Sequence, residues 1–584
     1  MYQSSPVVGA HEYRWRLPRH GAGWWAVWGW ALFRGWLALG GVGGATEAPA
    51  RHGIVATVHP LATDAALAAM RQGGNAVDAA IAAALTLGVV DGHDSGIGGG
   101  CFLVIRLADG GIVAIDGRET APAAATRNMF VRQGKADAAL SQTGALAAGV
   151  QGALAAYAHA VAQHGKLPLR AHLNAAARVA EDGFVLNRGY AVRLKESASD
   201  LARFPASRAV LLHPDGSPLK AGDRLRQPDL AATYRAIAEH GLDWFYRGPF
   251  ARAAADWLRQ HGGRLRAQDF AAYQVRLRAP LRSTYRDLEI VGFPPPSSGG
   301  VHVAQILNML EHFDVPRLGP GSADFVHVAA EAMKRAFADR AHWLGDPDFA
   351  PVPVGLIAKG YAAQLAGQIS LHRARAVPGH GEPPGASSHT FERHTTHFSA
   401  ADASGVWVAG TATINTSFGS KIVVPGTGVL LNNEMDDFSA QPGVTNYFGL
   451  IGAEANSVAP GKRPLSSMAP TLVLREGVPI LALGAAGGPT IISQVALAIV
   501  NVVDFRMDLR AALAQPRFHH QWQPDELRIE RRMAPGVRRT LSVRGHKVKT
   551  VKSLAAIQAV GLDGSGKGFA GAHDPNVEGK TAGW

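Results

Sequence analysis

The sequence predicts a mixed α/β protein, built either as one large unit or as two domains. Its 584 residues exceed the usual length of a single domain. Hydrophobic residues make up 47% of the chain and charged residues 18%, which supplies an ample core. Helical patterns fill most of the first two-thirds, and β-hairpin patterns begin near residue 396. These observations indicate a globular protein in which helices and sheets both contribute.

The first 45 residues have the order of a secretory signal peptide. Arg14, Arg16 and Arg19 precede an apolar run over residues 21–44 that ends in small residues. Arg34 interrupts this run, which weakens both a signal and a membrane-spanning helix. We expect a periplasmic or secreted protein without a stable membrane partner. An uncleaved anchor and a misassigned start codon remain alternatives.

Cysteine count and charge exclude several classes of protein. The single cysteine, Cys101, excludes an internal disulfide framework and a cysteine-based zinc site. It opens the apolar run 101–105, so we expect a buried cysteine in a strand. The net charge of +12 comes from scattered basic residues without a long run or a nucleic-acid motif. We therefore expect a solvated basic surface and no nucleic-acid partner.

Two helices are predicted early in the chain. Residues 61–70 form a helical pattern that ends at Gly73-Gly74, and Asn75 is positioned to cap a second helix over 76–85. The second helix is apolar nearly all round, which predicts that it is buried.

Glycines 96 and 98–100 follow these helices and lead directly into a strand. In a dinucleotide-binding motif the glycines would follow a strand and open a helix. The order here is different, so a tight backbone crossing is the better interpretation. A further strand is expected over 112–116, and it ends just before Arg118.

The middle of the chain is mostly helical in pattern. Residues 140–275 carry helices broken at glycines, and the loop 294–300 leads into a helix over 301–313. A helix over 329–344 has a charged face. Residues 370–393 lose periodicity and are rich in Pro, Gly, His and Ser, the composition expected of an exposed and cleavable linker.

The last third of the chain changes to a β pattern. Residues 406–413 are predicted to pair with 397–401, and 471–474 with 479–483. Gly487-Gly488-Pro489 then opens an apolar helix over 490–503, with proline at a permitted position.

Several catalytic plans are excluded by missing motifs. The chain has no Gly-x-Ser-x-Gly elbow, no His-Glu-x-x-His pair and no phosphate loop. His519-His520 are adjacent and lack a carboxylate cluster, so a structural role is expected and no metal site is assigned.

A threonine nucleophile remains possible. A threonine at a free N-terminus carries its own base, an α-amine with a pKa of about 8. The linker that ends at His394 offers a place for the cleavage that would expose Thr395. Gly487 and Gly488 could supply backbone N–H donors for an oxyanion at the start of a helix.

At this point the sequence resembles the γ-glutamyltranspeptidase (glutathione hydrolase) family. The resemblance runs from about Gly53 to Trp584. It is carried by six ordered blocks: 95–100, 294–300, Thr395-Thr396-His397, 431–438, 463–468 and 516–522. The family implies a four-layer αββα sandwich of the N-terminal-nucleophile hydrolase type. It also implies a precursor that cuts itself between His394 and Thr395, giving a large subunit (46–394) and a small subunit (395–584) that form a heterodimer.

The resemblance also implies roles for individual residues. Thr395 would attack the γ-glutamyl carbonyl, Thr413 would hydrogen-bond the nucleophile, and water or an amino-acid or peptide amine would release the acyl group. Arg118, Ser466 and Ser467 would hold the substrate α-carboxylate. Asn415, Glu434 and Asp437 would hold its α-ammonium. Without this context, an ordinary ion pair with Glu119 is the favoured interpretation of Arg118. No cofactor is implied.

Some positions depart from the family pattern. Pro489 stands where many relatives have serine, and Ala485-Ala486 replaces Ser-Pro. A lid tyrosine of bacterial members aligns with Phe448, with Tyr447 beside it, so we expect aromatic gating to survive.

Two other functions compete with glutathione hydrolysis. A cephalosporin (glutaryl) acylase would share the fold and the self-cleavage, but a glutaryl group lacks the amine that Asn415, Glu434 and Asp437 would bind. A catalytically silent homologue with a binding role is the other alternative, and the intact threonines and glycines argue against it.

Overall fold

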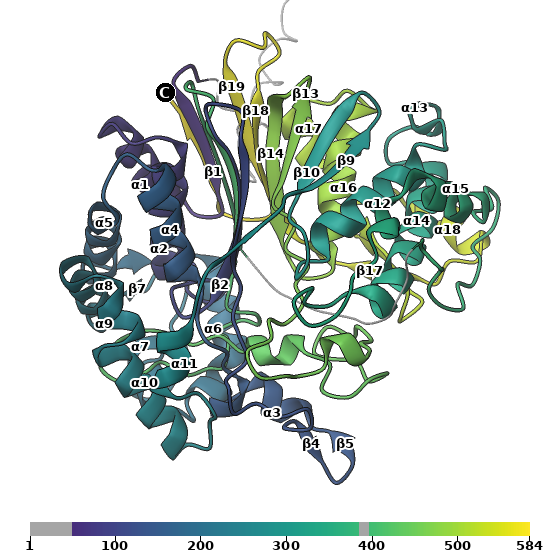
Figure 1. Cartoon of the computed structure of the whole chain (residues 1–584). Helices are drawn as coiled ribbons and strands as arrows, with labels where there is room; N and C mark the ends of the chain where they lie inside the picture. Colours follow the sequence, from purple (N-terminus) through teal and green to yellow (C-terminus); the bar gives the residue numbers. More distant parts are fainter. Residues whose placement is uncertain (1–49, 385–395) are drawn as a thin grey trace, which may run out of the picture. The chain divides into compact units, whose positions relative to one another are not determined.

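Two antiparallel sheets stack face to face between two layers of helices (Figure 1). The structure is a computed structural model that describes residues 50–384 and 396–584. Side chains from the facing sheets, among them Phe102, Phe293, Leu472 and Val560, form the apolar layer between them. This αββα arrangement is the fold that the resemblance implies.

The first sheet has seven strands in the order β20-β1-β11-β12-β2-β3-β8. Their bounds are β20 Lys580–Gly583, β1 Gly53–Thr57, β11 Thr396–Asp402, β12 Trp407–Thr413, β2 Gly100–Arg106, β3 Ile112–Gly117 and β8 Arg276–Arg278. The predicted hairpin is confirmed, because β11 pairs with β12 in a register that places Thr396 opposite Ala412. Strands from before and after residue 395 therefore alternate in one sheet.

The second sheet has six strands in the order β19-β18-β14-β13-β10-β9. Their bounds are β19 Phe569–His573, β18 Ala556–Leu562, β14 Val478–Ala486, β13 Thr471–Arg475, β10 Leu288–Gly292 and β9 Leu281–Tyr285. The predicted hairpin here, β13 with β14, is also confirmed.

Helices cover the outer face of each sheet. On the seven-stranded sheet these are α1 Pro60–Arg71, α2 Ala76–Val90 and α4 Ala153–His164, with α5 Leu169–Asp182 packed on α2 and α8 Pro228–His240 packed on α5. On the six-stranded sheet they are α12 Gly299–Leu310, α16 Thr490–Val503 and α17 Leu509–Ala514, with α14 Ala323–Trp343 packed on α12. The other helices are α3 Ala138–Gln142, α6 Arg188–Leu201, α7 Pro205–Leu211, α9 Leu242–Tyr246, α10 Pro249–Gln260, α11 Ala267–Ala272, α13 Val315–Leu318, α15 Lys359–Gly367 and α18 Pro535–Val543. The short strands are β4 Val131–Arg132, β5 Lys135–Ala136, β6 Phe184–Val185, β7 Arg224–Leu225, β15 Phe518–His519, β16 Leu527–Glu530 and β17 Val548–Val551.

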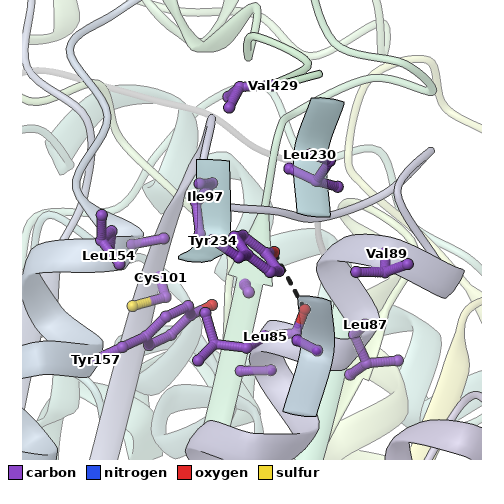
Figure 2. Packing of buried hydrophobic residues seen from close by; sticks show 14 of the residues in the cluster. Leu85, Leu87, Val89, Ile97, Cys101, Leu154, Tyr157, Leu230, Tyr234 and Val429 are labelled. Atoms are coloured by element: carbon purple, nitrogen blue, oxygen red, sulfur yellow. Dashed lines mark hydrogen bonds between the residues drawn. The ribbon is translucent and has the colours of Figure 1, made fainter. Parts of the chain in front are cut away.

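Helix α2 is buried along its whole length, as its apolar sequence predicts. Asn75 caps it, and the Asp78 side chain completes a capping box. Tyr234 of α8 reaches across to donate a hydrogen bond of 3.2 Å to the Leu85 carbonyl (Figure 2). The helix runs five residues past its predicted end at 85, which places Asp91 at its C-terminus.

The glycine block before β2 is a tight backbone crossing, as expected. A β-carbon on Gly99 would lie 1.8 Å from the Thr413 carbonyl oxygen, and one on Gly98 would lie 1.9 Å from that of Leu430. Only glycine permits this approach. The block therefore holds the end of β12 and the segment around residue 430 against the start of β2.

The charged face of α14 is buried. Lys334 and Arg335 form ion pairs with Glu331 at 2.7 and 3.0 Å, and all three side chains are almost fully covered. Burial raises the pKa of Glu331, but Lys334 and Arg335 outweigh it, so the net shift is downward. The charges on this helix are internal ion pairs that hold surrounding chain segments.

His519 and His520 have structural partners. His519 contacts Ser493 and Gln521, and His520 contacts Asp525 at 3.2 Å. Within residues 50–384 and 396–584, no helix is both long and apolar enough to cross a bilayer.

Candidate active site

The central strands β11 and β12 bring the predicted catalytic segment to one end of the first sheet. Thr396 is the first residue of β11 and lies opposite the end of β12, where Thr413 stands. His394 and Thr395 themselves lie outside the described residues. The described residues next to this position include Thr413 at the end of β12.

Thr413 has a fixed hydrogen-bond direction. Its Oγ1 donates to Glu434 Oε1 at 2.9 Å and accepts from the Asn415 backbone N–H at 2.8 Å. The threonine is fully buried, and it links β12 to the short helical turn 434–437. Thr413 and Glu434, both predicted from the sequence, therefore lie in direct contact.

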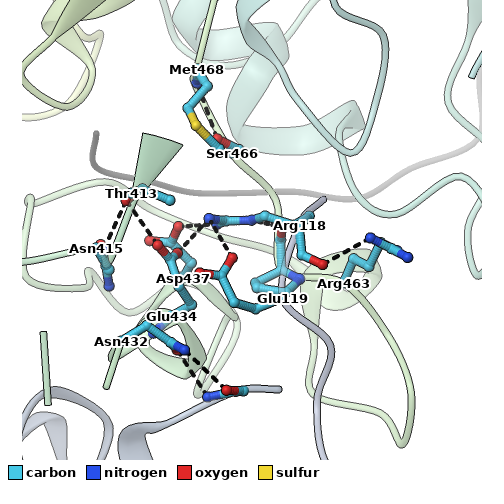
Figure 3. A network of polar contacts seen from close by, with 12 residues as sticks. Arg118, Glu119, Thr413, Asn415, Asn432, Glu434, Asp437, Arg463, Ser466 and Met468 are labelled. Atoms are coloured by element: carbon cyan, nitrogen blue, oxygen red, sulfur yellow. Dashed lines mark hydrogen bonds and ion pairs between the residues drawn. The ribbon is translucent and has the colours of Figure 1, made fainter. Parts of the chain in front are cut away.

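Arg118 lies at the centre of the site (Figure 3). It follows the last residue of β3, and its guanidinium forms an ion pair with Glu434 at 2.5 Å and a second with Asp437. The pair with Glu119, which the sequence alone favours, is longer at 3.5 Å. All four side chains are fully buried. Burial lowers the pKa of Arg118, but Glu434 and Asp437 raise it by more. The net shift of the pKa is upward, so the guanidinium stays charged.

The site contains more carboxylates than cations. Burial raises the pKa of Glu434, with Arg118 opposing the shift. Burial and the nearby Glu434 raise the pKa of Glu119 well above its ordinary value. This favours a protonated Glu119 and leaves Arg118 to balance Glu434 and Asp437. The arrangement attracts a second positive charge.

Asn415 offers a hydrogen-bond acceptor. It has a left-handed backbone conformation with φ of 72°, and its Nδ2 donates to the Asn433 carbonyl at 2.9 Å. Because that contact requires a donor, it identifies the amide nitrogen, and the other side-chain atom, Oδ1, is the acceptor. Oδ1 is buried and has no hydrogen-bond partner among the described residues. A buried acceptor in this state indicates a place for a donor from a ligand.

The segment 464–467 passes between two buried arginines. Arg118 Nε donates to the Pro464 carbonyl at 2.9 Å and another guanidinium nitrogen donates to the Leu465 carbonyl at 3.2 Å. The Ser467 hydroxyl lies 2.5 Å from the guanidinium of Arg340. Ser466 Oγ accepts from the Met468 backbone N–H at 3.1 Å. The segment that carries both predicted serines is therefore held against Arg118 in space, through the carbonyls of Pro464 and Leu465.

Gly487 and Gly488 occupy the junction between β14 and α16. Both have positive φ, 129° and 67°, and Pro489 is the N-cap of the helix. Three residues earlier, a β-carbon on Gly484 would lie 2.4 Å from the His397 ring. The two glycines therefore follow a close crossing between β14 and β11, the strand that begins at Thr396.

His397 is not positioned as a general base. Its ring nitrogens lie 2.9 Å from Thr411 Oγ1 and 2.9 Å from Ser399 Oγ. Burial lowers the pKa of His397 to about 3, so it stays neutral near pH 7. This agrees with a mechanism in which the base is not a histidine.

Sequence reasoning missed Asp91, and this residue contacts Thr396 at the start of β11. The Thr396 hydroxyl donates to Asp91 Oδ2 at 2.7 Å. Asp91, His93 and Asp94 are the one group of three potential metal-ligating side chains in the described parts of the chain whose donor atoms lie within 4.8 Å of one another. The signal that could have revealed them is three polar residues directly after an apolar helix.

The predicted lid residues lie together. Tyr447 is 59% exposed, and its ring packs edge-on against Phe448 at 4.7 Å between centroids. Phe448 is partly buried against the core of the six-stranded sheet, and its carbonyl accepts from Gln521. An exposed ring on a fixed neighbour agrees with the lid role, which stays a prediction.

Comparisons with known proteins relate this chain to one family. The sequence model described as Gamma-glutamyltranspeptidase matches residues 62–584. The chain is 42% identical to the glutathione hydrolase proenzyme of Escherichia coli (strain K12), over 92% of each chain. It is also 42% identical to the acylase ACY 1 proenzyme of Pseudomonas sp. (strain SE83), over 85% of this chain and 87% of that one. Among solved structures, a cephalosporin acylase from Bacillus halodurans superposes with a TM-score of 0.83 and 28% identity, covering 92% of this chain and 97% of that chain.

Proposed function

This chain belongs to the γ-glutamyltranspeptidase family, and we propose that Thr395, exposed by self-cleavage after His394, is its nucleophile. The enzyme is a γ-glutamyltransferase and glutathione hydrolase of the N-terminal-nucleophile type.

The proposed reaction has two steps. Thr395 Oγ attacks the γ-carbonyl carbon of the substrate, and its proton passes to the α-amine of the same residue. The carbon–nitrogen bond then breaks, the leaving amine takes up that proton, and a threonine ester remains. Water hydrolyses the ester, or the amine of an amino acid or peptide takes the γ-glutamyl group. Backbone N–H groups of Gly487 and Gly488 would stabilise the oxyanion, and Thr413 would hydrogen-bond the nucleophile.

One observation carries the substrate assignment: a buried arginine paired with two carboxylates, beside an acceptor without a partner. A γ-glutamyl group ends in a zwitterion, with one carboxylate and one ammonium. The substrate carboxylate can form the ion pair with Arg118 in place of Glu434 and Asp437. The substrate ammonium can then bind these two carboxylates and Asn415 Oδ1. The substrate adds one positive and one negative charge, so the net charge of the buried site does not change. Each charge-assisted hydrogen bond contributes roughly 1.5–3 kcal/mol.

The same observation argues against a glutaryl substrate. A glutaryl group lacks the ammonium, so it would leave two carboxylates and the Asn415 acceptor facing no cation. An unsatisfied buried polar group costs about 1–3 kcal/mol, and more when it is charged. We therefore propose that γ-glutamyl compounds such as glutathione are the preferred donors, although an acylase relative shares the same level of identity.

The sheet topology supports a lasting two-subunit product. In the seven-stranded sheet, β11 lies between β1 and β12, and β12 pairs in turn with β2. The strands β1 and β2 precede the proposed cut, whereas β11 and β12 follow it. The subunits 46–394 and 395–584 would thus share one hydrogen-bonded sheet. The signal-like composition of residues 1–45, which lie outside the described part, supports a periplasmic or secreted location.

The experiment combines processing and activity. Wild-type protein should give two bands on a denaturing gel, with a mass that matches a cut before Thr395. It should release p-nitroaniline from γ-glutamyl-p-nitroanilide, faster with glycylglycine as acceptor. Thr395→Ala should remain one inactive chain, and the matched control Thr395→Ser should still be cut. A processed or active Thr395→Ala protein would place the nucleophile elsewhere.

A further inference from the structure

Arg340 is a second buried arginine near the carboxylate subsite. We propose that Arg340 is a positioning residue that fixes the Ser467 hydroxyl as a hydrogen-bond donor to the substrate α-carboxylate. The inference rests on the proposed role of Ser466 and Ser467 in binding that carboxylate.

Arg340 reaches the subsite from α14. The arginine is fully buried, and its guanidinium contacts two serine hydroxyls. Nε lies 2.8 Å from Ser298 Oγ, and a terminal nitrogen lies 2.5 Å from Ser467 Oγ. Ser298 stands at the start of α12, in the loop predicted from the Pro-Pro-Pro-Ser-Ser-Gly-Gly sequence. A residue of the large subunit thereby contacts a proposed binding residue of the small subunit.

The hydrogen-bond directions follow from chemistry. A guanidinium can only donate, so Ser298 and Ser467 both accept from Arg340. The single hydroxyl hydrogen of Ser298 has the Ser466 carbonyl at 2.8 Å as its acceptor. A lone pair of Ser467 is occupied by Arg340, which leaves its hydrogen to donate.

The Ser467 hydrogen has a weak partner in the protein. Among the described residues, the acceptor within reach is Ser298 Oγ at 3.0 Å, an oxygen that already accepts from Arg340. A substrate carboxylate is a better acceptor, because a charged oxygen makes a stronger and shorter bond. The hydroxyl therefore stands ready to turn toward the substrate without breaking a strong contact.

Two titratable neighbours of Arg340 are His302 and Asp339. Burial and the charge of Arg340 lower the pKa of His302 to about 3, so this neighbour adds no second cation near pH 7. Asp339, the adjacent acid, binds Gln305, Tyr361 and the Gly381 N–H. With Arg118 bound to the carbonyls of Pro464 and Leu465, cations hold both ends of the segment 464–467.

The test compares two anilide substrates on the processed enzyme. γ-Glutamyl-p-nitroanilide carries the α-carboxylate, and 4-aminobutyryl-p-nitroanilide keeps the amine but lacks the carboxylate. The ratio of their kcat/KM values measures recognition of the carboxylate and does not depend on how much of the enzyme is folded. Arg340→Met should lower this ratio about 10- to 100-fold, the range of one charge-assisted bond, mainly through KM for the γ-glutamyl substrate.

Two variants separate positioning from general structural damage. Arg340→Lys should restore part of the ratio, because its ammonium can serve one of the two serines. Arg335→Met removes another buried, ion-paired arginine of the same helix, whose contacts are Glu331 and the Gln368 carbonyl. It should lower stability and leave the ratio unchanged. If Arg340→Met does not fold, an unchanged ratio in Arg340→Lys contradicts the proposal.

A double-mutant cycle with Ser467→Ala completes the test. If Arg340 acts through this hydroxyl, Arg340→Met should lower the ratio far less in the Ser467→Ala background. If Ser467→Ala lowers the ratio and Arg340→Met does not, the positioning role is wrong and the carboxylate subsite stands. If neither Ser467→Ala nor Ser466→Ala nor Arg118→Lys lowers the ratio, the proposed carboxylate subsite itself is wrong.

Discussion

The hydroxyl of Thr396, the first residue of β11, donates to the carboxylate of Asp91 at 2.7 Å. These residues lie 305 positions apart, and the bond ties the start of β11 to the end of the buried helix α2. Thr396 directly follows Thr395, the proposed nucleophile, in the sequence.

The first prediction concerns the stability contributed by Asp91. Burial raises the pKa of Asp91 to about 6, with His93 opposing the shift and Asp94 adding to it. A carboxyl group with a raised folded-state pKa stabilises the protein below its unfolded-state pKa of about 4, and this contribution is lost as the pH rises through 6. Asp91→Asn stays neutral, so wild type should lose stability relative to this variant between pH 4 and 7. Thermal unfolding at four pH values measures the difference, and parallel Tm curves would contradict it.

The second prediction concerns Arg118. Arg118→Met leaves Glu434 and Asp437 buried without their cation, a change that typically costs 3–5 kcal/mol. We expect a lower Tm and at least a ~100-fold loss in kcat/KM for γ-glutamyl-p-nitroanilide. If the variant has a higher KM and a nearly unchanged kcat, the loss is one of substrate binding. An unchanged kcat/KM would remove Arg118 from the substrate site.

The third prediction concerns selectivity for the substrate amine. Asp437→Asn removes one of the two charges that pair with Arg118 and, by our proposal, with the ammonium. The preference for a γ-glutamyl over a glutaryl anilide should fall about 10-fold. Asp436→Asn is the matched control, because the Asp436 carboxylate accepts from Ser141 at 2.5 Å. If Asp437→Asn keeps the wild-type preference, the ammonium assignment is wrong.

The fourth prediction concerns the glycine crossing. Gly99→Ala would force a methyl group to within 1.8 Å of the Thr413 carbonyl oxygen, so the ends of β12 and β2 must separate. We expect a severe loss of soluble, self-cleaved protein. A denaturing gel measures the cleavage, and thermal unfolding measures the stability. Gly360→Ala, in helix α15 with open space around it, should be neutral or slightly stabilising. Normal processing of Gly99→Ala would show that the crossing is not required.

Local patterns in the sequence predicted much of this fold. The cap at Asn75, the hairpin of β11 and β12 and the helix after Gly488 each depend on neighbouring residues, and each is found. The sequence pattern predicts an end of α2 at residue 85, five residues early, because the polar Thr86 and the glycine at 88 weaken the pattern there although both are buried.

Partners distant in the chain could not be predicted in this way. A charged residue is predicted to be exposed unless its counter-ion is known, so the sequence alone does not predict that the charged face of α14 is buried. Arg118 and Glu434 are separated by more than 300 positions, and their pairing is set by how β3 and the turn 434–437 meet. Only the family resemblance brought them into one site, and it assigned neither Asp91 nor Arg340.

The alternation of strands in the seven-stranded sheet has a consequence for assembly. If the chain is cut after residue 394, as we propose, β11 and β12 remain hydrogen-bonded between β1 and β2. Two separate polypeptides would have to find this interleaved order by collision, whereas the uncut precursor reaches it by folding one chain. Maturation would then be a one-way step: the cut enzyme persists because its strands cannot part without dismantling the sheet, and denatured mature subunits should regain activity far less readily than the denatured precursor.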